Sequence, residues 1–477
     1  MPEPHPTQIT ADLCIIGAGS GGLSIAAGAA QMGARVVLIE GGEMGGDCLN
    51  SGCVPSKALI AAAKAAQAMR TPAPYGVKPV EPEIDFAAVM DHVARTIATI
   101  APMDSQDRFE GFGVTVLRAY ARFTSANTLS AGGTTVRARR FVIATGSRPL
   151  VPPVPGIETV PYLTNETIFA QRERPAHLIV LGGGPIGIEM AQAHRRLGAA
   201  VSVVGGRKIL GRDDPETAAV VLDALRAEGV TLYEGRHVVR LGRLGADIEA
   251  VLSDGTVITG SHLLVAAGRQ VALDRLNLAA AGVAFTDKGV TVGPDLRTTN
   301  RRIYAVGDAA GGLQFTHVAG AHAGIVIKQV LFGLPAAFST RAIPWVTYTD
   351  PELAQVGLTE ARARELHGDA LTVIRQDFRH NDRAQTEGKT KGLLKVMIVK
   401  GRPVGASVVG AQAGELIGIW ALAISSRLKM SAIAGMVAPY PTLGEIAKRA
   451  AGAYFSPRLF DNPWLKRVVR TVQRLVP

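Results

Sequence analysis

Residues 11–22 read ADLCIIGAGSGG, and residues 35–40 read RVVLIE. The first apolar run is followed by three glycines with the spacing G-x-G-x-x-G: Gly17, Gly19 and Gly22. In a dinucleotide-binding turn the first glycine permits the tight turn, the second admits a pyrophosphate, and the third lets helix and strand pack closely. The second apolar run ends on Glu40, where a carboxylate can accept the ribose hydroxyls. The stretch therefore predicts a strand–helix–strand unit that binds a dinucleotide.

The same pattern returns in the middle of the chain. Residues 178–181 read LIVL, and three glycines with the same spacing follow: Gly182, Gly184 and Gly187. The next apolar run, residues 200–204, ends on Gly205-Gly206-Arg207-Lys208 instead of an acid. NAD-selective sites usually place an acid there for the 2′-hydroxyl, whereas a cation suits a 2′-phosphate. The pattern predicts a second dinucleotide unit and favours NADPH over NADH, unless Arg207 and Lys208 are ordinary surface cations.

Length and composition indicate an α/β protein of several domains. The chain has 477 residues, and one core rarely grows beyond roughly 250–300, so two or three domains are expected. Its 54 glycines suit a fold with many tight turns. The net charge is +11, which two phosphate-rich cofactors explain without nucleic acid. We see no nucleic-acid-binding motif and expect no such partner.

Several features of the sequence favour a cytoplasmic protein. The N-terminal residues 1–13, MPEPHPTQITADL, lack the basic start and apolar run of a secretory signal. No stretch approaches 18 uninterrupted apolar residues, so no spanning helix is expected. All three cysteines lie within the first 53 residues, which excludes a disulfide framework across domains.

Two of these cysteines form a close pair in residues 45–59, GGDCLNSGCVPSKAL. Cys48 and Cys53 could be half of a zinc site, but a closed site needs four ligands and the only other cysteine is Cys14, in the first apolar run. They could also form a structural disulfide, although so small a loop constrains little chain, or be unrelated thiols. Directly after a dinucleotide unit, a redox-active pair is the favoured interpretation, and no resident metal site is expected.

On these motifs the chain resembles the pyridine nucleotide-disulfide oxidoreductases, a family that includes dihydrolipoamide dehydrogenase, glutathione reductase and mercuric reductase. The resemblance covers essentially the whole chain. In chain order the matching motifs are GAGSGG at 17–22, GGDCLNSGCVPSK at 45–57, ATGSRP at 144–149, GGGPIGIEMA at 182–191 and YAVGD at 304–308.

The resemblance implies a cofactor for each glycine turn and a role for each cysteine. FAD is expected at the first turn, and NADPH or NADH at the second. Cys48 would be the interchange thiol that meets the acceptor, and Cys53 the charge-transfer thiol beside the flavin. Lys57 would lie at the flavin paired with Glu189; the alternative is a solvated helix lysine. Further cofactor-contacting residues implied by the resemblance are Thr145, Gly146, Gly268, Asp308, Thr316 and His317, of which Thr316 and His317 would begin a helix, with His317 contributing backbone.

One position departs from the disulfide reductases of this family. They carry a C-terminal His-Pro-Thr followed by Glu, and the histidine is the acid/base for the thiol. Here residues 439–445 read PYPTLGE, so Tyr440 stands in the histidine position and Glu445 is retained. A phenol with a pKa near 10 donates a proton but is a poor base at neutral pH. Mercuric reductases also carry tyrosine there, but they bring a C-terminal cysteine pair, and no cysteine follows Cys53.

The expected fold has two Rossmann-like dinucleotide-binding domains, as in glutathione reductase, and a C-terminal α+β dimerisation domain. We expect an FAD domain (1–153 and 271–340), an NAD(P)H domain (154–270), a dimerisation domain (341–455) and a basic tail (456–477). The Pro-rich segment 148–156 should link the first two domains as neither strand nor helix. Residues 414–429 and 442–454 should be helices, with a break at Ser456-Pro457.

The expected function is electron transfer from NAD(P)H through FAD and the Cys48–Cys53 disulfide to an acceptor. The acceptor would be a small-molecule or protein disulfide, or a soft metal ion. In a homodimer of the family type, Tyr440 and Glu445 would face Cys48 of the other subunit. Two alternatives stay open: a quinone or dye reductase acting at the flavin, and a redox-sensing or membrane-recruited FAD protein with little turnover.

The C-terminal tail is basic and amphipathic. An apolar stripe at helical spacing comprises Trp464, Leu465, Val468, Val469, Val472, Leu475 and Val476, and the cations Lys466, Arg467, Arg470 and Arg474 occupy other faces. Such a helix can lie on an anionic membrane surface. The alternative is that the stripe packs on the dimerisation domain while the cations stay solvated.

Overall fold

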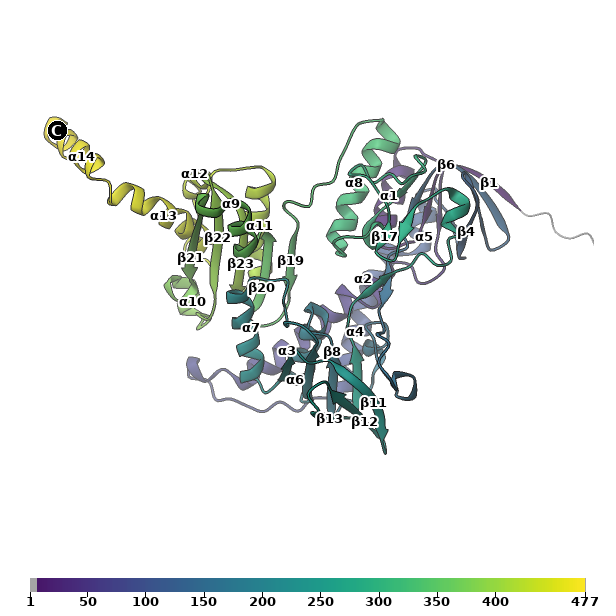
Figure 1. The fold of residues 1–477 in the computed structure, drawn as a ribbon, viewed down its shortest axis with the longest axis horizontal. Helices are drawn as coiled ribbons and strands as arrows, with labels where there is room; N and C mark the ends of the chain where they lie inside the picture. The colour runs from purple at the N-terminus through teal and green to yellow at the C-terminus, as the bar shows by residue number, and fades with distance from the viewer. Residues whose placement is uncertain (1–6, 477) are drawn as a thin grey trace, which may run out of the picture.

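The computed structural model describes residues 7–476, which form three α/β units and a projecting C-terminal helix (Figure 1). The first unit contains a seven-stranded sheet in the order β3-β2-β1-β6-β5-β4, with β18 paired to β6. Its strands are β1 Gln8–Ile16, β2 Val36–Ile39, β3 Thr115–Leu117, β4 Ala121–Ser125, β5 Thr128–Ala131, β6 Thr134–Ile143 and β18 Ile303–Ala305. Every residue of β2 is buried, as expected of a parallel strand covered on both faces.

Helices α1 (Ser20–Gln31) and α8 (Thr316–Phe332) pack together on one face of this sheet (Figure 1). Strands β1, β2 and β6 end in register, because Ile16 pairs with both Ile39 and Ile143. Their carboxyl ends therefore meet at one edge, where ligands bind in open α/β sheets. The other helices of this part of the chain include α2 Gly46–Asn50, α4 Phe86–Ile100 and α5 Gln106–Gly111.

The second unit contains a four-stranded parallel sheet, in the order β10-β9-β8-β14, and a three-stranded antiparallel sheet, β11-β12-β13. Its elements are β8 His177–Leu181, α6 Pro185–Arg196, β9 Ala200–Gly205, α7 Pro215–Ala227, β10 Thr231–Glu234, β11 Val238–Leu244, β12 Asp247–Leu252, β13 Val257–Gly260 and β14 His262–Val265. The two dinucleotide units predicted from the glycine motifs are thus confirmed as parallel strand–helix–strand units in two separate sheets.

A long helix and a two-stranded ribbon connect these two units. The long helix α3 (Cys53–Arg70) leaves the first unit at Cys53 and packs on α6 of the second. Strand β7 (Ser147–Pro149) pairs antiparallel with β15 (Arg269–Val271). The expectation that residues 148–156 form no strand is wrong for Arg148 and Pro149. A proline is tolerated there because this ribbon has only two strands and leaves an edge unpaired.

The third unit is a five-stranded antiparallel sheet, β19-β20-β23-β22-β21, with helices packed on it, as expected of the α+β C-terminal domain. Its elements are β19 Pro344–Thr347, β20 Glu352–Gly357, α9 Glu360–His367, β21 Leu371–Asp377, α10 Asp382–Thr386, β22 Leu393–Val399, β23 Arg402–Gly410, α11 Ala413–Ser425 and α12 Met430–Ala434. The small pair β16 Phe285–Thr286 and β17 Gly289–Val290 belongs to the first unit.

A buried ion cluster fixes the third unit to the second. Lys395 of β22 is only 4% exposed, and its Nζ lies 2.8 Å from Asp214, the N-cap of α7. The same Nζ lies 2.8 Å from Glu216 and 2.7 Å from Glu360. A buried lysine needs such partners, because removing an unpaired ammonium from water costs several kcal/mol. The cluster therefore holds α7 against the sheet of the third unit.

The C-terminal helices differ from the expectation. Helix α11 ends at Ser425, four residues before the expected Lys429, and α13 runs from Glu445 to Phe460, straight through Ser456 and Pro457. The predicted break at Ser456-Pro457 is wrong. The break lies instead at Asp461, and Asn462 caps the next helix, α14 (Pro463–Leu475), by accepting from two backbone N–H groups. No helix within residues 7–476 has the length and apolarity needed to cross a membrane.

Candidate active site

One cavity of about 2230 Å³ opens between the three units and contains most of the predicted site residues. It is lined by Gly17, Gly19, Glu40, Cys48, Cys53, Lys57, Thr145, Gly146, Gly182, Gly184, Glu189, Arg207, Gly268, Asp308, Thr316 and His317. Gly22 and Gly187 lie behind its wall, where they have the packing role predicted for the third glycine of each turn. Residues of both dinucleotide turns thus face the cysteine pair across one continuous space.

The first glycine turn leaves no space for a side chain at its first and third glycines. Gly17 has φ +108°, and a Cβ there would lie 2.3 Å from the carbonyl oxygen of Ala144. A Cβ on Gly22 would lie 1.9 Å from the oxygen of Gly17, whereas one on Gly19 would meet nothing closer than 4.0 Å. Gly19 therefore borders free space at the start of α1, where a pyrophosphate can approach the backbone.

The polar groups around this turn fit FAD. Glu40 accepts the N–H of Ala18 and that of Gly42, each at 2.6 Å, which places its carboxylate at the end of β2 facing the cavity. Helix α1 begins without a side-chain cap, so its first N–H groups are available to an anion. The buried hydroxyl of Thr145 has no hydrogen-bond partner in the described chain. A buried unsatisfied hydroxyl beside a dinucleotide turn is accounted for by a polar ligand group.

The cysteine pair lies where α2 meets α3. Cys14, by contrast, is fully buried in β1, and burial alone raises its thiol pKa, as expected of an inert core residue. The Sγ of Cys53 lies 3.3 Å from Oγ1 of Thr316 at the start of α8. A hydrogen bond from Cys48, then Thr316 and the charge of Lys57, outweigh burial and lower the pKa of Cys53 to about 6. The same contact with Cys53, together with burial, raises the pKa of Cys48. At neutral pH the pair therefore carries a thiolate at Cys53 and a thiol at Cys48.

Lys57 is anchored across the boundary between the first two units. Its Nζ lies 2.7 Å from Oε2 of Glu189 on α6 and 4.4 Å from the ring centroid of Tyr348. The other oxygen of Glu189 accepts the backbone N–H of Tyr348 at 3.0 Å. Glu189 is only 5% exposed, so the ammonium is its main charge compensation. The structure thus places Lys57 in the cavity as an ion pair rather than as a solvated helix lysine.

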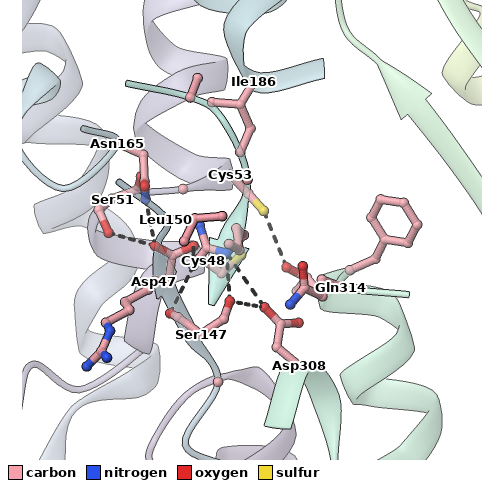
Figure 2. A pocket seen from close by; sticks show the side chains of 18 of the residues that line it. Asp47, Cys48, Ser51, Cys53, Ser147, Leu150, Asn165, Ile186, Asp308 and Gln314 are labelled. Atoms are coloured by element: carbon pink, nitrogen blue, oxygen red, sulfur yellow. Dashed lines mark hydrogen bonds and ion pairs between the residues drawn. The ribbon is translucent and has the colours of Figure 1, made fainter. Parts of the chain in front are cut away.

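A carboxylate that the sequence analysis did not select lies next to Cys48. Oδ1 of Asp47 accepts a hydrogen bond from Nδ2 of Asn165 at 2.8 Å and another from the hydroxyl of Ser51 at 3.0 Å (Figure 2). Its Oδ2 lies 3.2 Å from Arg269, which also donates to Ser147 at 2.7 Å. Ser147 in turn donates to Asp308, whose pKa is raised by burial. We call these contacts the Asp47–Arg269 network. It joins the segment that carries Cys48 to Ser147 and Asp308 in the wall of the cavity. The only sequence signal was an acid directly before Cys48.

The second glycine turn repeats the backbone geometry of the first. A Cβ on Gly182 would lie 2.2 Å from the oxygen of Ala266, and one on Gly187 would lie 2.1 Å from the oxygen of Gly182. Gly184 has free space, and α6 begins without a side-chain cap. These features fit the pyrophosphate of a nicotinamide nucleotide.

The groups at the far end of this second site are mainly basic. After β9 the cavity is lined by Arg207, Lys208, Arg212 and His237. The nearest carboxylate in the chain sequence is Asp213, which is buried, accepts the indole N–H of Trp345 at 2.7 Å, and has its pKa raised by burial to about 6. Arg207 and Lys208 face the cavity as expected, and Arg212 and His237 are additions that only the folded chain reveals.

Tyr440 and Glu445 do not reach this cavity within the chain. Tyr440 is 69% exposed on the third unit, and its hydroxyl donates to Asp382 at 3.0 Å. That hydrogen bond raises the pKa of the phenol above its ordinary value. Glu445 is paired instead with Arg449 at 3.2 Å. The structure therefore gives Tyr440 a carboxylate partner, Asp382, that the sequence analysis did not predict.

His317 has a structural role within the chain. Its Nε2 lies 2.8 Å from the carbonyl oxygen of Pro344, and its ring stacks on Phe315 at 5.2 Å. Burial lowers its pKa, so the ring is neutral at pH 7 and donates to that carbonyl. This side chain ties the start of α8 to β19.

Comparison with protein families gives two matches. The family described as pyridine nucleotide-disulphide oxidoreductase matches residues 11–323. Its dimerisation domain matches residues 343–451. Together the two matches cover the three units of the fold but stop before the end of α13 and all of α14.

Individual relatives cover nearly the whole chain. The mercuric reductase of Streptomyces lividans is 35% identical over 457 residues, which are 93% of this chain and 96% of the relative. The mercuric reductase of Acidithiobacillus ferrooxidans is 34% identical over 93% of this chain and 82% of its own. The HOCl-induced flavoprotein disulfide reductase RclA from Escherichia coli superposes with a TM-score of 0.84 and 28% identity, covering 92% of this chain and 99% of RclA. A Cu(II) complex of RclA superposes with a TM-score of 0.83 at 28% identity, covering 92% of this chain and 98% of that one.

Proposed function

Because this chain belongs to the pyridine nucleotide-disulphide oxidoreductase family, we propose that it passes electrons through the Cys48–Cys53 pair to a thiophilic metal cation. The chain is an FAD-dependent oxidoreductase that takes its electrons from NAD(P)H. FAD, when bound, supplies hydride acceptance from the nicotinamide nucleotide and two-electron reduction of the disulfide. The observation that carries the proposal is the position of Cys48 and Cys53 in the cavity between the two nucleotide turns, with Sγ of Cys53 3.3 Å from Oγ1 of Thr316.

The two cysteines have different parts in this reaction. Cys53 holds the thiolate on the side of Thr316 and Lys57, and Cys48 holds the proton. Transfer to the acceptor requires Cys48 to lose that proton, because the thiolate is both the nucleophile and the metal ligand. The choice of acceptor therefore depends on what removes the proton from Cys48.

The lack of a suitable base for Cys48 favours a metal cation over a disulfide as the acceptor. A disulfide acceptor needs a base for Cys48 and then an acid for the departing thiol. Tyr440, in the position of the family histidine, has a raised pKa and cannot act as that base at neutral pH. A thiophilic cation needs no such group, since coordination itself deprotonates a thiol. Oxidation of the dithiolate to the Cys48–Cys53 disulfide releases two electrons, which reduce two Cu(II) ions to two Cu(I) ions.

The relatives support the same class of acceptor. The curated relatives reported above are mercuric reductases, and one solved neighbour is a Cu(II) complex. Hg(II) and Cu(I) are both soft ions that prefer thiolate ligands. A low-molecular-weight or protein disulfide is the second candidate acceptor.

For the coenzyme we propose NADPH rather than NADH. The proposal rests on Arg207, Lys208, Arg212 and His237 along the cavity and on the absence of an acid at the end of β9. A 2′-phosphate can form charge-assisted hydrogen bonds with these cations, whereas the 2′-hydroxyl of NADH has no carboxylate partner there.

The dimerisation domain supports a homodimer. We propose that Tyr440, held by Asp382, faces Cys48 of the other subunit and acts there as a proton donor. Its 69% exposure within the single chain fits a side chain that meets a second subunit.

The test is an acceptor panel on the purified holoenzyme, with NADPH oxidation followed for Cu(II), Hg(II), glutathione disulfide, lipoamide and a quinone. Cu(II) reduction, followed also with a Cu(I) chelator, should be lost in Cys48→Ser and in Cys53→Ser, while quinone reduction by the flavin persists. Tyr440→His should raise disulfide turnover by supplying the missing base. Faster turnover of either disulfide than of any metal ion in the wild type would refute the metal acceptor.

A second outcome of the same panel would identify a quinone or dye reductase that acts at the flavin alone. If both cysteine variants keep full turnover with every acceptor, the chain is a quinone or dye reductase that does not use the thiols. The comparison of variants therefore decides between the two functions.

A further inference from the structure

Helix α14 lies outside everything that the proposed reaction uses. None of its residues is buried, and it projects from the third unit beyond α13 (Figure 1). Its apolar residues stand in solvent: Trp464 is 69% exposed and Leu475 77%. The packing of this stripe on the dimerisation domain, one of the two readings of the sequence, does not occur within the chain.

The helix has two sharply separated faces. At about 100° per residue, the seven apolar residues of residues 464–476 fall within an arc of about 140°. Lys466, Arg467, Arg470 and Arg474 all fall on the opposite side. None of these four cations forms an ion pair within residues 7–476, and residues 463–476 contain no acid. The positive charge of the helix is therefore uncompensated by residues 7–476.

We propose that α14 is a membrane-surface anchor that binds anionic lipid headgroups and inserts its apolar face at the headgroup–acyl boundary. The valine and leucine side chains supply the inserted area, and Trp464 suits the interface because its indole has an apolar body and a polar N–H. The four cations supply attraction to anionic lipids. A lipid surface satisfies both faces of the helix at once.

A second copy of this chain is a poorer occupant. The helix has 13 residues and is about 20 Å long, so pairing of two such helices falls well below the roughly 800 Å² per partner of a stable interface. Each of the two α14 helices would also bring four cations and no acid. Like charges oppose that pairing, whereas an anionic surface relieves them.

The anchor is not inserted permanently. One short helix without a covalent lipid gives reversible attachment, and its electrostatic part is screened by salt. The enzyme would therefore exchange between solution and the membrane surface.

The test is co-sedimentation of the full-length FAD-loaded protein with vesicles. Vesicles of phosphatidylcholine mixed with phosphatidylglycerol should bind the protein. Vesicles of phosphatidylcholine alone should bind it with an affinity that is lower by about tenfold or more. Binding to the mixed vesicles should fall as salt is raised. The emission of Trp464 should shift to the blue on binding, and the shift should be missing in Trp464→Phe.

Three double variants of α14 separate its two faces. Val468→Ser/Val472→Ser removes apolar area, and Arg467→Gln/Arg470→Gln removes half of the helix cations; each should weaken binding about tenfold or more. Thr471→Ala/Gln473→Ala, between the two faces, is the matched control and should bind as the wild type does. All three should retain FAD.

The result that would overturn the proposal is equally clear. Equal binding of the wild type and the valine variant would assign lipid attraction to the general basic charge of the protein. No binding to either vesicle, together with a loss of dimer mass in a chain ending at Asp461, would assign α14 to a contact between two copies. No binding with an unchanged dimer would also reject the anchor.

Discussion

The two glycine turns of this protein have the same backbone geometry, but the side chains at the end of the second strand of each unit carry opposite charges. At the first, Gly17 and Gly22 close the turn and Glu40 ends the second strand. At the second, Gly182 and Gly187 close the turn in the same way, but β9 is followed by cations. The backbone therefore supplies what the two cofactors share, a pyrophosphate, and the side chains supply what distinguishes them.

The largest effect should come from a side chain at the closed point of each turn. Gly17→Ala places a Cβ 2.3 Å from a backbone oxygen at φ +108°, so it should destabilise the FAD domain by about 3 kcal/mol or more and abolish FAD binding. Gly182→Ala should destabilise the second domain similarly while FAD is retained. Flavin absorbance after gel filtration and the melting temperature are the measurements.

The middle glycines are the matched controls for that prediction. A Cβ on Gly19 meets nothing closer than 4.0 Å, and one on Gly184 meets nothing within 4 Å. Gly19→Ala and Gly184→Ala should keep the apoprotein melting temperature and lose cofactor affinity only. A large drop of melting temperature in Gly19→Ala would show that its role is the fold rather than access of the pyrophosphate.

The next effect concerns the cations that follow β9. Arg207→Ala should raise the KM for NADPH about tenfold to a hundredfold, the usual value of one lost charge-assisted hydrogen bond, and leave the KM for NADH nearly unchanged. Steady-state kinetics with both coenzymes measure this. Lys288→Ala, an exposed cation outside the cavity, is the control. An equal rise for both coenzymes would remove the distinction that we draw between the two turns.

A smaller effect concerns the carboxylate next to those cations. Burial raises the pKa of Asp213 to about 6, so in the folded protein this group binds a proton below pH 6 that the unfolded chain releases above about 4. The contribution of Asp213 to wild-type stability should therefore fall as the pH rises from 4 to 7. Asp213→Asn, which can still accept the N–H of Trp345, should gain about 2 kcal/mol relative to the wild type over that range.

Thermal melts of both proteins across this pH range test the prediction. A stability difference between Asp213→Asn and the wild type that does not change with pH would show that burial does not raise the pKa of Asp213 above its unfolded value.

The smallest effect concerns the carboxylate of Asp47, beside the cysteine pair. Asp47 lies near Cys53 and raises its pKa, whereas Arg269 compensates Asp47 at 3.2 Å. Asp47→Asn should lower the pKa of Cys53 further, and Arg269→Gln should raise it. The rate of alkylation of the reduced protein as a function of pH gives both values. Shifts of the same sign in the two variants would mean that the Asp47–Arg269 network holds the loop without tuning the thiol.

Local sequence determined the two dinucleotide units and the cysteine pair. Gly22 and Gly187 could be assigned because a Cβ on either would meet the oxygen of the first glycine of its own turn, which is a local restriction. Gly17 and Gly182 were assigned from the same spacing, although the atoms that exclude a Cβ there belong to Ala144 and Ala266, far along the chain. The strands before and after each turn were predicted from short apolar runs, which are decided by burial on both faces of a parallel sheet. The pairing of Lys57 with Glu189 came from the family resemblance and was found in the structure at 2.7 Å.

Tertiary structure decided which side chains meet across long separations. Asp47 and Arg269 are more than two hundred residues apart, and Tyr440 meets Asp382 rather than Glu445. Such contacts depend on strand register and on how whole domains pack, so no local period reveals them. The helix break was misplaced at Ser456-Pro457 because a proline weakens a helix locally, whereas α13 is held by burial of its earlier turns. Likewise, the sequence predicted the amphipathic helix α14, but only the fold shows that no part of residues 7–476 covers it.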